Sequence, residues 1–173
     1  KEFDLGNRQV EKARLYVTGL GNYVFYINGE RVGKDLLTPG WTDYHKRVEY
    51  QVYDVTGMIN DGTVALGAEL GNMWWSGGVG WKGGVRYSEG PLKLLAQLAV
   101  KFEDGTEELL VTDTTWKWSE SATVYDHLYH GETYDANLDV EGWNLPRFDD
   151  NGWQPAEAAS YEGILAGPRF PAL

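Results

Sequence analysis

Residues 71–84, GNMWWSGGVGWKGG, combine three tryptophans with six glycines. Tryptophan offers a large flat apolar face, and glycine lets backbone amides and carbonyls come close to a bound molecule. Neither a regular helix nor a strand favours this composition, so the stretch predicts a loop. Two interpretations stay open: the indoles of Trp74, Trp75 and Trp81 line a binding platform, or they cover one end of a hydrophobic core.

Oxygen-bearing side chains gather in several stretches that predict loops. Calcium prefers such oxygens from Asp, Glu and Asn, together with backbone carbonyls, although the chain contains no EF-hand pattern. The alternative is that each acid caps a turn or faces solvent. The stretches are TPGWTDY (38–44), GNMWW (71–75), HGETYDAN (130–137) and FDDNG (148–152).

Motifs for catalysis are absent from the sequence. It contains neither the G-x-S-x-G elbow of a serine hydrolase nor the H-E-x-x-H pattern of a zinc protease. His127 and His130 have a spacing that suits one face of a helix, but their segment does not have a helical pattern. Glu132 and Asp135 are acids that a glycosidase could use, yet nothing fixes the separation that such a pair needs. We therefore expect no catalysis by this chain alone.

The composition narrows the possible partners. A formal net charge of −11 repels phosphate backbones and anionic lipids, so we expect neither nucleic acid nor a membrane as a partner. No apolar run approaches the roughly 20 residues of a membrane span. The chain has no cysteine, which excludes disulfides and thiolate metal sites. Aromatic residues make up 14%, a surplus that suits the recognition of a neutral ligand such as a sugar.

Alternating apolar residues predict strands through most of the chain, with turns at short intervals. The pattern indicates an all-β fold, either a β-sandwich or a jelly roll. Trp116 and Trp118 are two residues apart, which predicts that both lie on one face of a strand. We expect the sandwich over residues 1–159 and a Gly/Pro-rich tail or linker over 160–173. The predicted strands cover 13–20, 22–29, 46–55, 63–70 and 91–102, with a hairpin turn at 103–107.

Long runs of the chain resemble the N-terminal β-sandwich domain of bacterial α-L-rhamnosidases. They include YINGERVGKDLLTPGWTDYHKRVEYQVYDVTGMI, LGNMWWSGGVGWKGG, GPLKLLAQLAVKFEDGTEELLVTDTTWKW, YHGETYDANLDVEGWN and FDDNGWQPA. The resemblance covers about Ala13 to Ala156. Where the family often has Gly-Asp-Gly-Trp, this chain has Gly-Asn-Met-Trp, which keeps an oxygen at Asn72 without the charge.

The resemblance implies a jelly-roll β-sandwich of the galactose-binding-like kind. It also implies a non-catalytic carbohydrate-binding module similar to family 67, which binds L-rhamnose through calcium. In α-L-rhamnosidases the catalytic acids lie on a separate barrel. The partners implied are therefore a rhamnose-containing glycan and the catalytic domain of a parent enzyme. An extracellular or periplasmic location follows from the same reasoning. The alternative is a structural domain that packs against that catalytic barrel and binds no sugar.

The residues that carry the binding prediction match the family's regular loops. The predicted carbohydrate-binding residues are Asp43, Asn72, Trp74, Trp75, Trp81, Glu132 and Asp135. Calcium is the predicted cofactor, with Asp43, Asn72, Glu132 and Asp135 as its ligands.

Overall fold

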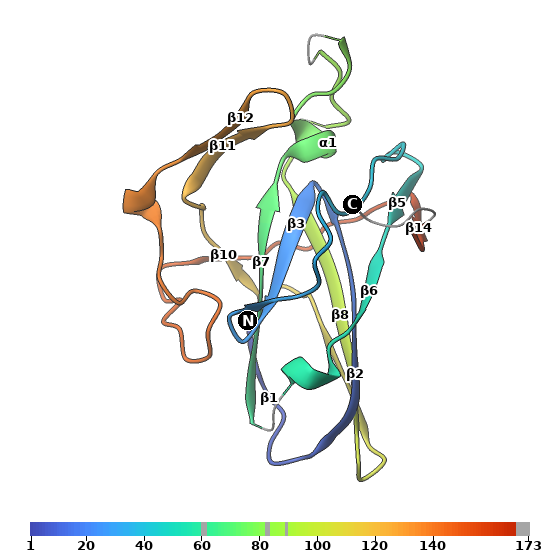
Figure 1. Cartoon of the computed structure of the whole chain (residues 1–173), viewed down its shortest axis with the longest axis vertical. Helices are drawn as coiled ribbons and strands as arrows, with labels where there is room; N and C mark the ends of the chain where they lie inside the picture. Colours follow the sequence, from blue (N-terminus) through green and yellow to red (C-terminus); the bar gives the residue numbers. More distant parts are fainter. Residues whose placement is uncertain (60–61, 82–83, 89, 169–173) are drawn as a thin grey trace.

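A computed structural model of the chain describes residues 1–59, 62–81, 84–88 and 90–168. Lys82 and Gly83 of the predicted 71–84 loop, and residues 169–173 of the predicted tail, therefore lie outside the described residues. Two four-stranded antiparallel sheets form the body of the molecule (Figure 1). One sheet has the order β1 (Glu2–Asp4), β7 (Thr63–Gly71), β3 (Asn22–Ile27), β4 (Glu30–Arg31). The other has the order β6 (Gln51–Asp54), β2 (Val10–Leu20), β8 (Lys93–Phe102), β9 (Glu107–Val111).

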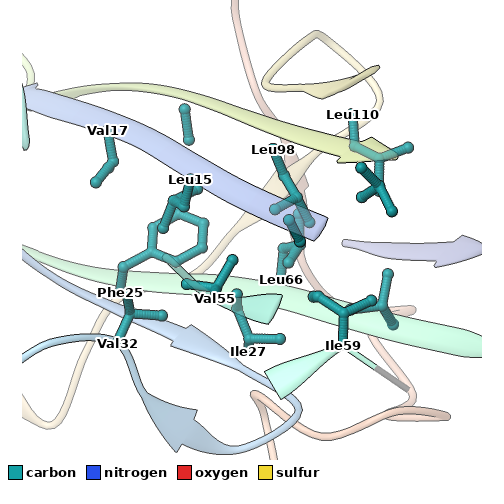
Figure 2. Packing of buried hydrophobic residues seen from close by; sticks show 14 of the residues in the cluster. Leu15, Val17, Phe25, Ile27, Val32, Val55, Ile59, Leu66, Leu98 and Leu110 are labelled. Atoms are coloured by element: carbon teal, nitrogen blue, oxygen red, sulfur yellow. The ribbon is translucent and has the colours of Figure 1, made fainter. Parts of the chain in front are cut away.

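The core lies between the two sheets, because alternate residues of each strand point inward. In β3, Tyr23, Phe25 and Ile27 are buried while their neighbours along the strand are half-buried. Figure 2 shows Phe25 and Ile27 meeting Leu15 of β2 and Leu98 of β8 in one apolar cluster. This arrangement confirms the predicted all-β sandwich. The jelly-roll connectivity stays a prediction.

Three smaller strand pairs extend the sandwich. β11 (Thr123–His127) and β12 (Gly131–Tyr134) form a hairpin beside the upper end of the first sheet (Figure 1), and the 3-10 turn η3 (Ala136–Leu138) follows it. β10 (Lys117–Trp118) pairs with β13 (Gln154–Pro155). The hairpin confirms that the segment with His127 and His130 is not helical.

The predicted strand 46–55 is two strands that belong to different sheets. β5 (Arg47–Glu49) pairs in parallel with β14 (Ile164–Ala166), whereas β6 pairs with β2. Tyr50 lies at the break, where its amide donates to the carbonyl of Ala166 at 2.8 Å. An alternating pattern cannot show this division, since both strands keep the same period of two.

Part of the segment predicted as a tail lies against the sandwich. Besides the β14 pairing, the ring of Tyr161 packs on a cluster that includes Tyr44 and Val48, and Lys93 Nζ donates to the carbonyl of Ser160 at 3.1 Å. The boundary at residue 159 stays a prediction. Among the described residues, no helix is long and apolar enough to cross a membrane.

Candidate functional site

The loop after β7 begins with α1 (Met73–Ser76), a single helical turn at the upper end of the sandwich (Figure 1). The amides of Trp75 and Ser76 donate to the carbonyl of Asn72, which closes the turn. Beyond it, Val79 and Val85 exchange backbone hydrogen bonds. The described part of the predicted loop therefore begins with a folded turn and ends in a backbone pairing.

The three tryptophans of this loop have different surroundings. Trp75 is only 8% exposed, Trp74 is half-buried, and Trp81 is 91% exposed. Trp75 packs edge-on against Tyr44, and its indole N–H donates to the carbonyl of Pro91 at 3.3 Å. We therefore reassign Trp75 from the ligand-contacting wall to the packing beneath it, because its ring offers almost no face to a ligand.

Trp74 belongs instead to an aromatic surface that it shares with a second loop. The indole of Trp41 stacks on it, with ring centroids 5.7 Å apart and an interplanar angle of 23°. Trp41 is 57% exposed, and its indole N–H donates to the hydroxyl of Tyr87 at 3.2 Å. Tyr87 in turn packs edge-on against Tyr44. We call Trp41, Trp74 and Tyr87 the aromatic platform.

Two polar groups at the aromatic platform belong to buried surroundings: the hydroxyl of Tyr44 and the indole N–H of Trp74. Desolvation raises the pKa of Tyr44 far above its ordinary value, with smaller contributions from Tyr87 and Glu49, so Tyr44 stays neutral. Its hydroxyl donates to the carbonyl of Gly40 at 3.2 Å. The indole N–H of Trp74 is buried and has no hydrogen-bond partner in the described part of the chain. Such an unpaired donor costs about 1–3 kcal/mol, which makes it a feature that packing alone does not explain.

A polar pair lies at the start of α1. Asn72 donates its side-chain N–H to Asp126 Oδ2 at 2.8 Å and its backbone N–H to Asp126 Oδ1 at 2.9 Å. The hydroxyl of Ser76 donates to Asn72 Oδ1 at 2.7 Å. Asp126 lies on β11, so this contact joins the hairpin to α1. The amide of Asn72, which is two residues before Trp74 in the sequence, and the carboxylate of Asp126 therefore form one polar contact at the start of α1.

Glu132 lies on the same face of the hairpin as Asp126. The two residues are directly opposite each other in the β11–β12 register, and opposite residues of antiparallel strands project to one face. Glu132 is exposed. The structure thus brings Glu132 to the side of the hairpin that contacts Asn72.

Asp43 and Asp135 have local roles instead. Asp43 Oδ2 pairs with Lys46 Nζ at 3.1 Å, and this hydrogen bond is the main reason that the pKa of Asp43 is lowered. Asp135 precedes η3 and accepts from the backbone and side-chain N–H groups of Asn137 at 3.0 and 2.7 Å. Both acids cap turns, which is the alternative that the sequence left open for them.

The predicted calcium ligands do not converge on one point. Among the described residues, no group of three or more His, Asp or Glu side chains could hold a metal ion. Asp43, Glu132 and Asp135 therefore do not form a metal cluster as arranged, and Asn72 already bonds to Asp126 and Ser76. The predicted side chains alone therefore do not make a calcium site, and other oxygen donors would have to complete it.

Sequence reasoning missed Trp41, Tyr87 and Asp126 as site residues. Trp41 had a signal, because it stands in the Pro39-Gly40-Trp41 stretch that carries the resemblance, next to the chosen Asp43. Tyr87 and Asp126 had none: each is a single residue of common type, and only the tertiary contacts place it beside the loop at 71–81.

The class of molecule is now defined: a two-sheet all-β domain with an exposed aromatic platform and a polar pair at one end. The description "Alpha-L-rhamnosidase N-terminal domain" belongs to the family model that matches residues 8–171, so the chain belongs to this family. The match confirms the resemblance of the sequence, and it continues past the predicted boundary at residue 159.

Individual α-L-rhamnosidases are similar to this chain in sequence and in structure. An α-L-rhamnosidase of Streptomyces avermitilis is 46% identical over 158 residues, which are 91% of this chain and 15% of that protein. The crystal structure of Streptomyces avermitilis α-L-rhamnosidase complexed with L-rhamnose superposes with a TM-score of 0.90 at 44% identity, covering 96% of this chain and 16% of the other. The native enzyme of Aspergillus terreus gives 0.92 at 38% identity, covering 99% and 20%. This chain therefore spans less than a quarter of the length of these relatives.

Proposed function

We propose that this chain is a non-catalytic carbohydrate-binding module that recognises L-rhamnose or a rhamnose-containing glycan. The observation that carries the proposal is the aromatic platform, in which the partly exposed indole of Trp41 stacks on that of Trp74. A deoxyhexose has a methyl group and C–H faces that stack on an indole, and hydroxyls that bond to an amide or carboxylate. Support comes from the family and from a relative whose structure was solved with L-rhamnose.

Catalysis, in this proposal, belongs to another part of a longer protein. The chain corresponds to 15–18% of the length of the matching α-L-rhamnosidases, which leaves room for a separate catalytic domain. We place the whole protein outside the cytoplasm, in an extracellular or periplasmic location where polysaccharides occur. The net charge of −11 favours a neutral glycan over nucleic acid or anionic lipid.

Calcium dependence is a separate part of the proposal. Glu132 and Asn72 would supply side-chain oxygens, and backbone carbonyls would have to complete the coordination. Because the described residues hold no group of three or more His, Asp or Glu side chains that could bind a metal ion, these other oxygens are necessary to the proposal. Sugar binding by the platform does not require the ion to be present.

Titration calorimetry of the chain with L-rhamnose tests the proposal. We expect a dissociation constant between roughly micromolar and millimolar, because one sugar makes few contacts and the loops lose conformational entropy on binding. Repeating the titration after chelation with EGTA, and again with added calcium, tests the ion separately. No heat of binding at millimolar sugar in the presence of calcium would reject the sugar-binding function.

The second candidate is a structural domain that packs on a catalytic barrel without binding sugar. The observation in its favour is a set of exposed apolar side chains on and after the β11–β12 hairpin. They are Val124, Tyr125, Tyr129, Tyr134, Leu138 and Val140. A surface of this kind is typical of a domain interface. Association with a separately expressed catalytic domain, together with no response to rhamnose, would favour this function.

A further inference from the structure

We infer that Tyr44 is a positioning residue, which holds the indole of Trp41 in the orientation that the aromatic platform presents to a ligand. The inference rests on the proposed function and adds a residue to it. Tyr44 is only 1% exposed, so it acts through Trp41 rather than by contact with a sugar. Two connections join the residues: one runs through the backbone at Gly40, and the other runs through the side chain of Tyr87.

Tyr44 is itself a fixed point at one end of the sandwich. Its ring belongs to a buried cluster with Leu20, Val48 and Trp75. It packs edge-on against Trp75, with ring centroids 6.1 Å apart and an interplanar angle of 83°. A side chain in a closely packed interior has little freedom to change its rotamer. Groups that bond to Tyr44 or pack on it are therefore held in place.

The backbone connection fixes how the chain enters Trp41. The hydroxyl of Tyr44 donates to the carbonyl of Gly40 at 3.2 Å. This carbonyl and the N–H of Trp41 belong to one peptide unit, which is planar. A hydrogen bond to the carbonyl therefore also sets the direction of the backbone at Trp41.

The side-chain connection fixes the edge of the Trp41 ring. Tyr44 packs edge-on against Tyr87, with ring centroids 5.3 Å apart and an interplanar angle of 85°. The hydroxyl of Tyr87 accepts the indole N–H of Trp41 at 3.2 Å. The backbone N–H of Tyr87 donates to the carbonyl of Trp75 at 3.2 Å, so Tyr87 is attached at both its backbone and its ring. Trp41 is thus held at its backbone and at its indole nitrogen by groups that meet at Tyr44.

This arrangement decides what Trp41 offers to a ligand. Its indole N–H is already donated to Tyr87, and its ring stacks on Trp74. Trp41 is nevertheless 57% exposed. The exposed part therefore meets a ligand as apolar ring surface, which suits the C–H groups of a deoxy sugar.

The deciding measurement is the circular dichroism of the stacked indoles. Two indoles in close contact couple their electronic transitions and give a couplet, and the part of it that is lost in Trp41→Ala belongs to this pair. Tyr44→Phe removes only the hydroxyl. We expect it to reduce the couplet and to weaken L-rhamnose binding about three- to tenfold, the equivalent of one hydrogen bond. An unchanged couplet or native rhamnose affinity in folded Tyr44→Phe would overturn the inference.

Thr56→Val is the matched control, because it also removes one hydroxyl that bonds to the backbone. The Thr56 hydroxyl accepts from the N–H of Ala13 at 3.0 Å. Thr56 lies in η1 (Thr56–Met58), in the lower half of the sandwich away from α1 (Figure 1). We expect both variants to lower the urea midpoint of unfolding by less than about 1 M, but only Tyr44→Phe to change the couplet and the affinity. An equal loss of the couplet in Thr56→Val would reflect general loosening and would overturn the inference.

Tyr87→Phe covers the case in which Tyr44→Phe does not fold. It removes the acceptor for the indole N–H of Trp41 and keeps the ring that packs against Tyr44. We expect a reduced couplet here too. An unchanged couplet in Tyr87→Phe would then overturn the inference, since the orientation of Trp41 would not depend on the contacts that meet at Tyr44.

The couplet also separates this inference from the proposed function. If the unmodified chain binds no rhamnose, the proposed function fails, but the couplet still reports on the orientation of Trp41. A reduced couplet in Tyr44→Phe, with a native couplet in Thr56→Val, then supports the positioning role. An unchanged couplet in Tyr44→Phe overturns it.

Discussion

The indole of Trp41 stacks on that of Trp74, and the two residues come from loops on separate parts of the chain. Trp41 lies in the connection between β4 and β5, and Trp74 lies in α1 after β7. The stack has one partly exposed ring over one half-buried ring, so it offers a flat apolar surface that is supported from beneath. A platform built by two loops therefore forms only when both loops are in place.

Replacing Trp41 by alanine tests the platform directly. We expect Trp41→Ala to weaken rhamnose binding by about tenfold, because it removes the exposed ring. The free energy of unfolding should change by less than about 1 kcal/mol, since Trp41 is 57% exposed. Calorimetry and urea unfolding measure the two effects. Trp118→Ala, which removes a ring of similar exposure on β10, serves as the control and should leave binding unchanged.

The different burial of Trp75 and Trp81 gives a prediction about stability. Trp75→Ala should cost about 3–5 kcal/mol, because the ring is buried against Tyr44 and a cavity would remain. Trp81→Ala should change stability by no more than about 0.5 kcal/mol, since the ring is 91% exposed. Urea unfolding of both variants provides the comparison. Equal costs for the two substitutions would mean that the loop is arranged differently.

Substitutions at Asp135 and Glu132 should have different effects, one on stability and the other on rhamnose affinity. Asp135→Ala removes the acceptor for Asn137 before η3 and should cost about 1 kcal/mol of stability, with rhamnose affinity unchanged. Glu132→Gln should change affinity rather than stability, because Glu132 is exposed on the face that Asp126 shares. Calorimetry measures the rhamnose affinity of each variant, and thermal unfolding measures its stability. A loss of rhamnose affinity in Asp135→Ala would mean that Asp135 is part of the binding site.

Acid stability should depend on three turn aspartates. Asp54, Asp104 and Asp113 each accept from a threonine two residues later, and these hydrogen bonds lower the pKa of each carboxyl below 3.8. A carboxyl whose pKa is lower in the folded than in the unfolded protein adds to the free energy of unfolding, and this contribution is complete at a pH above the unfolded-state pKa. The contribution is lost as the pH falls through the folded-state pKa. We expect the free energy of unfolding to drop below about pH 4 and the drop to be smaller in Asp54→Asn, as measured by urea unfolding from pH 6 to pH 2. An identical pH profile in the variant would contradict the assignment.

The sandwich strands were predictable because each carries its own periodic pattern. β3, β7 and β8 alternate or contain apolar runs that a strand must bury, and the structure has them where the pattern indicates. Trp116 shows the limit of this reasoning. The prediction that it shares a strand face with Trp118 was wrong, because β10 begins at Lys117 and Trp116 lies in the preceding turn. Trp116 is buried and Trp118 is 48% exposed.

The candidate site was predictable only in part. The loop with Trp74 and Asn72 has an unusual composition that the sequence displays directly. Its partners Trp41 and Asp126 reach it through tertiary contacts, which depend on how loops from different strands meet at one end of the sandwich. Residue type alone also could not separate an exposed indole from a buried one, as Trp81 and Trp75 show.

The parallel pairing of β14 with β5 places a late part of the chain directly after the Asp43 turn. Ile164 N–H donates to the carbonyl of Lys46, and the Tyr50 N–H donates to the carbonyl of Ala166, each at 2.8 Å. Because β5 follows the loop that carries Trp41, the pairing with Ile164–Ala166 fixes the far end of that loop. A change in the β14 segment would therefore reach the aromatic platform through β5.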